Sequence, residues 1–282
     1  MVQGSMTAIL GKIGLNLAVA FGGLLSALPF IWMLSASFKS TSEIFRSPPA
    51  LFPDSFAITN YERLFSNWPF LYWYGNSLFV ALTVTIAVLI FSSLAGFGFA
   101  KYRFTGKRLL FLVLLGSTMI PFQIIVIPLF IIVSDLSWTN SHVSLIIPFM
   151  APAIGIFLMR QFISTVPDEL VDAARVDGAS DLRIYWQLII PLIVPGLATL
   201  AIITFLGTWN NFLWPLVVLR REEIMTLPVG MANMMQGVSA GSEPPYGPAM
   251  AASTLVSFPI IAVFLFVQRY YIAGLTIGAV KS

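Results

Sequence analysis

Residues 167–191 read PDELVDAARVDGASDLRIYWQLIIP, a polar segment between two long apolar runs. Pro167 suits the first position of a helix, where its missing N–H costs no hydrogen bond, and two acidic residues follow it in the first turn. Gly178 can adopt the left-handed conformation that ends a helix, and Ser180 can cap the next one. The segment therefore predicts a short helix, a glycine turn and a second helix that leads into the apolar run.

The spacing within this segment is that of a known motif. Residues 172–174 read DAA, Gly178 follows after three residues, and residues 188–191 read LIIP after nine more. This resembles the "EAA" motif in the permease subunits of ATP-binding-cassette importers: Glu-Ala-Ala, three residues, Gly, nine residues, Ile-x-Leu-Pro. The spacing agrees throughout, and the differences are Asp for Glu at 172, Leu for Ile at 188 and Ile for Leu at 190.

The resemblance covers most of the chain. Residues 209–215 read WNNFLWP and residues 268–276 read QRYYIAGLT, as in the carbohydrate-uptake branch, and the chain is similar to the second permease subunit of maltose-type importers. The resemblance implies an ATP-driven, binding-protein-dependent importer of an oligosaccharide or related polyol. It also implies these partners: a non-identical permease subunit in a heterodimer, two ATP-binding subunits that hold ATP and Mg, an extracytoplasmic solute-binding protein, the sugar and membrane lipid.

In that family the polar segment, here the coupling segment (residues 160–187), docks into a cleft of the ATPase subunit. ATP binding would move it as a lever and open the pore outward, and hydrolysis would reset it. No cofactor is implied for this chain itself. The residues that the resemblance assigns to the ATPase contact are Glu169, Asp172, Ala173, Ala174, Asp177, Gly178 and Ala179.

Composition and charge spacing predict an all-α, polytopic membrane protein with one permease domain over residues 1–282. Hydrophobic residues make up 58% of the chain, against about 45–50% in soluble domains, and the mean hydropathy is +0.89. The first uncharged run is longer than the roughly 7–15 apolar residues of a signal peptide, so we expect a retained anchor. The charges separate six predicted spans, residues 13–38, 74–100, 109–133, 143–159, 184–208 and 248–268.

Two features within the spans predict their shape. Ser92, Gly96 and Ala100 place small residues on one face of the second span, which would let a neighbouring helix approach closely. Prolines should interrupt the third span, at residues 121 and 128, and kink the fifth, at residues 191 and 195.

The basic residues predict the orientation, because cytoplasmic loops carry an excess of Lys and Arg. If the chain crosses the membrane six times, ten of its 15 Lys and Arg residues lie on the same side of the membrane as the amino terminus. We therefore expect both termini and the coupling segment in the cytoplasm of a prokaryote, and residues 39–73 and 209–247 outside. The basic loop 101–108 fits this topology, and attraction of acidic lipid headgroups is its second interpretation.

Several mechanisms are disfavoured by what the sequence lacks. The predicted spans contain no Asp, Glu, Lys, Arg or His, although ion-coupled carriers generally need such groups. No GxxxxGK[ST] phosphate loop and no cysteine are present. The coupling segment holds more acids than arginines, which argues against nucleic-acid binding. We expect a transport protein with no catalytic or metal-binding residues and no energy source of its own.

Two alternative functions remain. Residues 237–241 read GVSAG, which matches the GxSxG pattern of serine hydrolases with Ser239 as nucleophile. That fold needs a His after the Ser, and the chain's one histidine, His142, precedes it, so a chance match is favoured. The other alternative is a passive channel.

A substrate path is predicted at the outer end of the fifth span. Sugars are recognised by aromatic faces that stack on the ring and by amides that bond its hydroxyls. An interfacial aromatic belt explains the tryptophans equally well. The residues concerned are Trp209, Asn210, Asn211 and Trp214.

Overall fold

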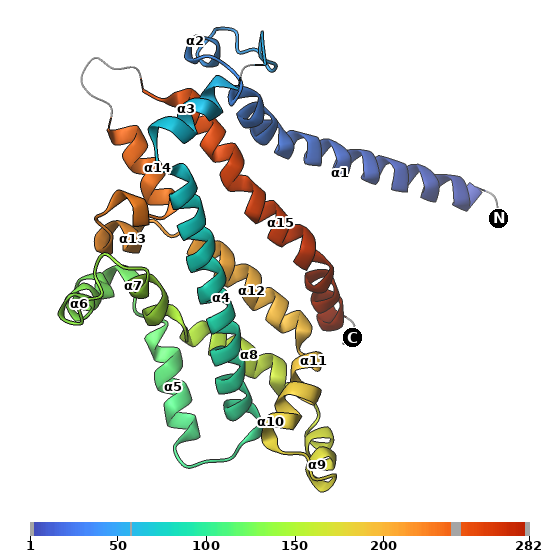
Figure 1. Ribbon diagram of the computed structural model, residues 1–282. Helices are drawn as coiled ribbons and strands as arrows, with labels where there is room; N and C mark the ends of the chain where they lie inside the picture. The colour runs from blue at the N-terminus through green and yellow to red at the C-terminus, as the bar shows by residue number, and fades with distance from the viewer. Residues whose placement is uncertain (1–2, 57, 238–243, 280–282) are drawn as a thin grey trace. The chain divides into compact units, whose positions relative to one another are not determined.

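The computed structural model describes residues 3–56, 58–237 and 244–279, in which the regular secondary structure is entirely helical (Figure 1). The chain divides into two compact units, Met1–Trp68 with Asn233–Ser257, and Pro69–Ala232 with Phe258–Ser282. A single permease domain over residues 1–282 stays a prediction. The longer helices are α1 (Gln3–Ala36), α3 (Thr59–Asn67), α4 (Phe70–Lys101), α5 (Lys107–Ser117), α6 (Phe122–Asp135), α8 (Ala153–Ser164), α9 (Asp168–Val176), α12 (Val194–Trp209), α14 (Leu227–Gln236) and α15 (Tyr246–Ala279). The shorter ones are α2 (Thr41–Ile44), α7 (Val143–Ile146), η1 (Ile147–Phe149), α10 (Asp181–Arg183), η2 (Ile184–Ile189), α11 (Ile190–Leu192), α13 (Leu213–Val218) and η3 (Glu222–Ile224).

Three of the helices are individually long and apolar enough to cross a membrane: Gly11–Ala36, Phe70–Lys101 and Tyr246–Phe266. Three bent pairs raise the number of spans to as many as six. The pairs are Lys107–Ser117 with Phe122–Asp135, bent by 100°, Val143–Phe149 with Ala153–Ser164, bent by 42°, and Asp181–Leu192 with Val194–Trp209, bent by 79°.

Prolines explain the three bends, because a proline offers no N–H to the preceding turn and clashes with it. The predicted interruptions of the third and fifth spans are confirmed: Pro121 directly precedes α6, and Pro195 lies in the first turn of α12. The interruption predicted at Pro128 is wrong, because α6 continues through Pro128 without a break. The fourth span was predicted as one helix over residues 143–159, which is wrong, because the chain breaks there and Pro152 caps the start of α8.

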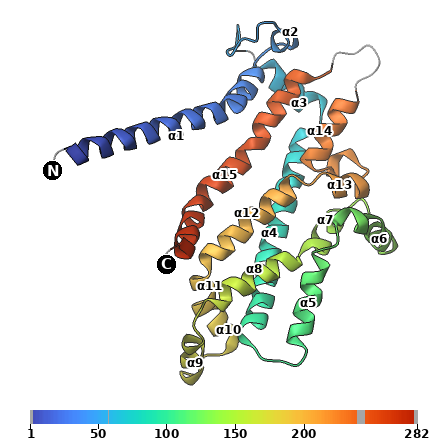
Figure 2. The ribbon, with the colours of Figure 1, turned by 180° about the vertical axis from the view of Figure 1, so that it is seen from behind.

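In the second unit, α4 packs against α8 and α12 (Figures 1 and 2). The predicted small face of α4 lies at the contact with α8. A Cβ atom added at Gly96 would lie 2.8 Å from the Met159 Cβ, and one added at Gly155 would lie 2.6 Å from the Ser92 Oγ. Two glycines, one on each helix, therefore allow the close approach that the spacing predicted.

Gly96→Ala is expected to destabilise this helix pair by about 1–3 kcal/mol, because the methyl group has no room. The measurement is the thermal unfolding midpoint of the purified protein. Gly98→Ala is the matched control, since it lies on the same helix and an added Cβ there meets nothing within 4 Å. Equal midpoints for the two variants would contradict the packing described for α4 and α8.

The described residues of the two segments predicted outside the membrane, 39–73 and 209–247, contain helices and side-chain hydrogen bonds. In the first unit, the Asn60 Nδ2 donates to the carbonyl oxygens of Ser37, at 2.9 Å, and Lys39, at 2.8 Å. In the second unit, the Trp73 Nε1 donates to the Glu222 carbonyl oxygen at 2.9 Å and ties η3 to the start of α4. These bonds replace water as partner for backbone groups in the connecting chain.

Candidate coupling segment and substrate path

The coupling segment has the predicted helix–turn–helix form, with one difference in register. Helix α9 begins at Asp168, and Pro167 is its extended N-cap residue, with ψ at 137°, rather than its first helical residue. Asp168 and Glu169 occupy the first turn, where the helix dipole favours carboxylates. The proline still fixes where the helix starts, because its φ of −56° suits entry into a helix.

The turn after α9 is built on Gly178, whose φ is +79° as predicted. The Gly178 N–H donates to the Arg175 carbonyl oxygen at 3.0 Å, and the Ala179 N–H donates to the Ala174 carbonyl oxygen at 2.9 Å. These two bonds form a Schellman motif, which requires a left-handed residue at the glycine position. The Ser180 Oγ then accepts from the Arg183 N–H at 3.4 Å, so the predicted cap on the next helix is confirmed.

Arg175 braces the two helices against each other. Its Nη1 lies 3.5 Å from the Asp172 Oδ1 on α9, and its Nη2 lies 3.5 Å from the Asp181 Oδ1 on α10. Its guanidinium also lies over the Tyr102 ring, 5.6 Å from the centroid, at the end of α4. Exposed ion pairs are individually weak, but one guanidinium contacts both helices and so favours their observed relative orientation.

Lys101 joins the coupling segment to α4. Its Nζ donates to the Val166 carbonyl oxygen and to the Asp168 Oδ1, the latter at 2.5 Å, and its side chain is only 4% exposed. The hydrogen bond from Lys101 holds the pKa of the Asp168 carboxyl below its usual range. The sequence pattern indicates only that Lys101 belongs to the basic loop, although its place in the last turn of a long uncharged helix is favourable for a cation.

The residues predicted to contact the ATPase subunit divide into two sets. Glu169, Asp172, Ala173, Asp177 and Gly178 are exposed. Ala174 and Ala179 instead pack against the apolar core of the second unit, which also buries Val171. The exposed residues of the predicted contact therefore lie on one side of α9 and its turn.

Three large apolar side chains of this segment were missed from the sequence. Val176 is 88% exposed, and Leu182 and Trp186 are also mostly exposed. The signal available in the sequence was their position on the helices, away from Val171, Ile184 and Tyr185, which are buried. Exposed apolar side chains beside carboxylates are typical of a surface that binds another protein.

The structure places Trp209 and Trp214 in the core. Trp209 is 1% exposed and stacks on Phe205 with ring centroids 5.8 Å apart, and Trp214 is fully buried with its Nε1 donating to the Ser144 carbonyl oxygen at 2.9 Å. Sugar stacking and an interfacial belt both need an exposed ring face, so neither prediction fits these two residues. Asn210 is exposed and its Nδ2 donates to the Leu206 carbonyl oxygen of its own helix.

Asn211, one of the four predicted residues, lines a cavity. This cavity has a volume of about 250 Å³ and lies between α4, η1 and α12. Thr204 and Thr208 line it as well. They lie one turn apart on α12, and Thr208 is three residues before Asn211. These three polar side chains make no hydrogen bond to any residue that the structure describes, so their donors and acceptors are free for a ligand.

The other sequence candidates form no site among the described residues. Ser239 lies outside them. His142 is half-buried, and its Nε2 lies 3.3 Å from the Ile224 carbonyl oxygen. Within the described part of the chain, no cluster of three or more His, Cys, Asp or Glu residues could hold a metal ion.

A multi-span helical chain with an exposed, braced loop segment defines a membrane permease rather than an enzyme. The family described as "Binding-protein-dependent transport system inner membrane component" matches residues 88–276. The chain belongs to this family of inner-membrane transport components.

Similar proteins and a solved structure support this family assignment. The chain is 36% identical to the arabinooligosaccharides transport system permease protein AraQ of Halalkalibacterium halodurans, over 95% of this chain and 96% of the relative. It is 33% identical to the lactose transport system permease protein LacG of Rhizobium radiobacter, over 93% and 94%. A crystal structure of a bacterial ABC transporter that imports the acidic polysaccharide alginate contains a chain with a TM-score of 0.80 and 27% identity, covering 94% and 97%.

Proposed function

We propose that this chain is one of two pore-forming subunits of an ATP-driven importer of oligosaccharides. The observation that carries the proposal is the braced coupling segment, with its left-handed Gly178 and exposed Asp172, in a chain of the permease family. The relatives named for arabinooligosaccharides and lactose support a sugar as substrate. The proposed partners are a second permease subunit, two ATP-binding subunits and an extracytoplasmic binding protein.

The coupling segment connects to two helices that line the cavity. Lys101 ties it to α4, and the π-helical turn η2 joins it to α11 and α12. Within η2, the Tyr185 hydroxyl lies 2.6 Å from the Ser93 Oγ of α4. A movement of the coupling segment would therefore be transmitted to α4 and α12 together. This supports the alternating-access mechanism, in which ATP supplies the work at one interface.

We further propose that the cavity face of α12 forms part of the sugar path. Thr204, Thr208 and Asn211 offer hydroxyl and amide groups that can replace the water bonded to sugar hydroxyls. Phe149 and Ile154 also line the cavity and provide apolar surface for the C–H face of a sugar ring. The path thus uses Asn211 of the original four residues and adds the two threonines.

The double substitution Thr208→Val and Asn211→Leu is expected to raise the KM of uptake about 5- to 100-fold, because each lost hydrogen bond is worth about 0.5–1.5 kcal/mol. The measurement is uptake of labelled arabinooligosaccharides by cells that carry the whole importer. Asn210→Leu is the matched control, since this amide bonds its own helix. Equal effects of the test and control variants would contradict the proposed path.

The proposed orientation places both termini and the coupling segment in the cytoplasm. Single cysteines test it cleanly, because the chain has none. A cysteine at Ser47 is expected to react with a membrane-impermeant maleimide from outside, and one at Ser180 only after the membrane is opened. Both positions are exposed. Labelling of Ser180→Cys in intact cells would overturn the orientation.

A further inference from the structure

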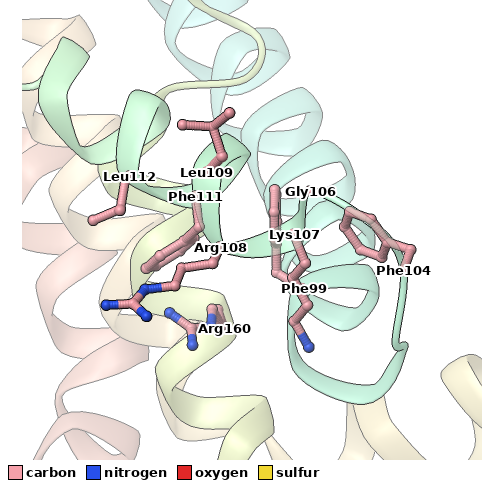
Figure 3. Close-up of a pocket in the computed structure, with 9 residues that line it drawn as sticks. All are labelled: Phe99, Phe104, Gly106, Lys107, Arg108, Leu109, Phe111, Leu112 and Arg160. Carbon is pink, nitrogen blue, oxygen red and sulfur yellow. The ribbon is translucent and has the colours of Figure 1, made fainter.

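A cavity of about 680 Å³ lies where α5 begins, between the end of α4, the following loop, α5 and α8 (Figure 3). Its walls are partly aromatic, with Phe99, Phe104 and Phe111 among the lining residues. It shares no lining residue with the cavity proposed for the sugar, which lies between α4, η1 and α12. No step of the proposed transport mechanism uses it.

Three cations line this cavity and no carboxylate does: Lys107, Arg108 and Arg160. In Figure 3 the guanidinium groups of Arg108 and Arg160 point the same way. The Arg160 guanidinium lies 3.8 Å from the centroid of the Phe111 ring. Neither arginine forms an ion pair with any acidic residue that the structure describes. Like charges gathered at one site repel one another, so a bound anion would stabilise the arrangement.

The donors suit a phosphate. Two guanidinium groups can each offer paired N–H groups to phosphate oxygens. The Lys107 Nζ donates to the Tyr102 carbonyl oxygen at 2.7 Å and keeps further N–H groups for a ligand.

The apolar surroundings favour a lipid over a free phosphate. Leu109 and Leu112 line the cavity, and Leu109 is 66% exposed. Exposed apolar side chains continue along α5 at Leu110 and Val113, and α5 is the first half of a candidate membrane span. A headgroup at the cations would leave an acyl chain free to lie along this helix face.

We propose that this cavity binds the headgroup of an anionic phospholipid, with Arg108 and Arg160 on its phosphate. The site itself follows from the charges and the apolar face. Its assignment to the cytoplasmic leaflet rests on the orientation in the proposed function. A lipid bound here would hold the start of α5 near the loop that follows Lys101, and so would steady the attachment of the coupling segment.

Native mass spectrometry of the purified, assembled importer tests the proposal. Delipidated complex is titrated with phosphatidylglycerol and, separately, with phosphatidylcholine. The wild-type complex is expected to prefer phosphatidylglycerol. The variant Arg108→Gln/Arg160→Gln should bind it about 10- to 30-fold more weakly, since a basic residue at a membrane surface contributes about 1 kcal/mol.

Two comparisons separate charge from misfolding. Arg220→Gln/Arg221→Gln removes the same charge from an exposed pair elsewhere and should leave phosphatidylglycerol binding unchanged. Arg108→Lys/Arg160→Lys keeps the charge and should retain most of the binding. Retention of the ATP-binding subunits and ATP-driven uptake are measured on the same preparations, so a failure of the proposed transport function is seen independently of lipid binding.

Three results would overturn the proposal. The first is equal binding of the two lipids by the wild-type complex, as expected if another subunit fills the cavity. The second is unchanged phosphatidylglycerol binding in Arg108→Gln/Arg160→Gln. The third is displacement of the lipid by millimolar inorganic phosphate, which would assign the cations to a free anion.

Discussion

Gly178→Val is expected to abolish coupled sugar uptake while the importer still reaches the membrane. The φ of +79° at this position is unfavourable for a β-branched residue and costs about 1–3 kcal/mol. The Schellman bonds of the Gly178 and Ala179 N–H groups depend on that conformation, so the turn would reorganise. The exposed face of α9 would then change its orientation relative to α4 and α12, the helices that we propose it moves.

Two controls isolate the turn from general strain. Gly178→Asn should retain most of the uptake, because Asn tolerates the left-handed region. Gly106→Val introduces the same strain at a φ of +82° in another loop, and an added Cβ has open space at both glycines. It should leave the ratio of sugar transported to ATP hydrolysed unchanged. Normal uptake by Gly178→Val, with the ATPase subunits attached, would show that this turn does not couple the subunits.

Asp172→Ala is expected to release the ATPase subunits from the purified complex. Truncating one member of a buried, hydrogen-bonded charge pair at an interface typically costs about 2–5 kcal/mol. Asp172 is exposed on α9, and among the residues that the structure describes its carboxylate pairs only with Arg175, so it is available to a partner. The measurement is the ratio of ATPase subunit to permease after affinity purification.

Matched controls distinguish a direct contact of Asp172 with the ATPase subunit from its ion pair with Arg175. Asp172→Glu keeps the carboxylate and should retain the ATPase subunits as well as the original residue does. Asp181→Ala removes the other carboxylate that pairs with Arg175 and should reduce retention much less. Equal losses for Asp172→Ala and Asp181→Ala would mean that Asp172 acts through the brace rather than through the partner.

Local signals allowed much of the fold to be predicted. Charges bracket the apolar runs, so the regions of the candidate spans follow from the sequence, and a glycine between a helix and a serine cap defined the turn at Gly178. Ser92 and Gly96 identified the packing face of α4 through spacing alone. In each case, residues within a few turns of one another determine the structure.

The missed features depend on residues that are distant in the sequence. Lys101 and Asp168 are 67 residues apart, and nothing local indicates that they pair. Trp209 was predicted to stack on a sugar or to belong to an interfacial belt at the outer end of the fifth span, but Phe205 and Tyr74 cover its ring. The cavity around Asn211 likewise exists only where α4, η1 and α12 meet. Composition and periodicity describe which residues are apolar, not which neighbours bury them.

The most direct test of the central claim is the coupling of ATP hydrolysis to sugar uptake in proteoliposomes that contain the complete importer. The account predicts that uptake requires ATP, that the binding protein with its sugar stimulates hydrolysis, and that Gly178→Val abolishes uptake without detaching the ATPase subunits. Sugar flux that proceeds equally without ATP would indicate a passive channel and would contradict the account.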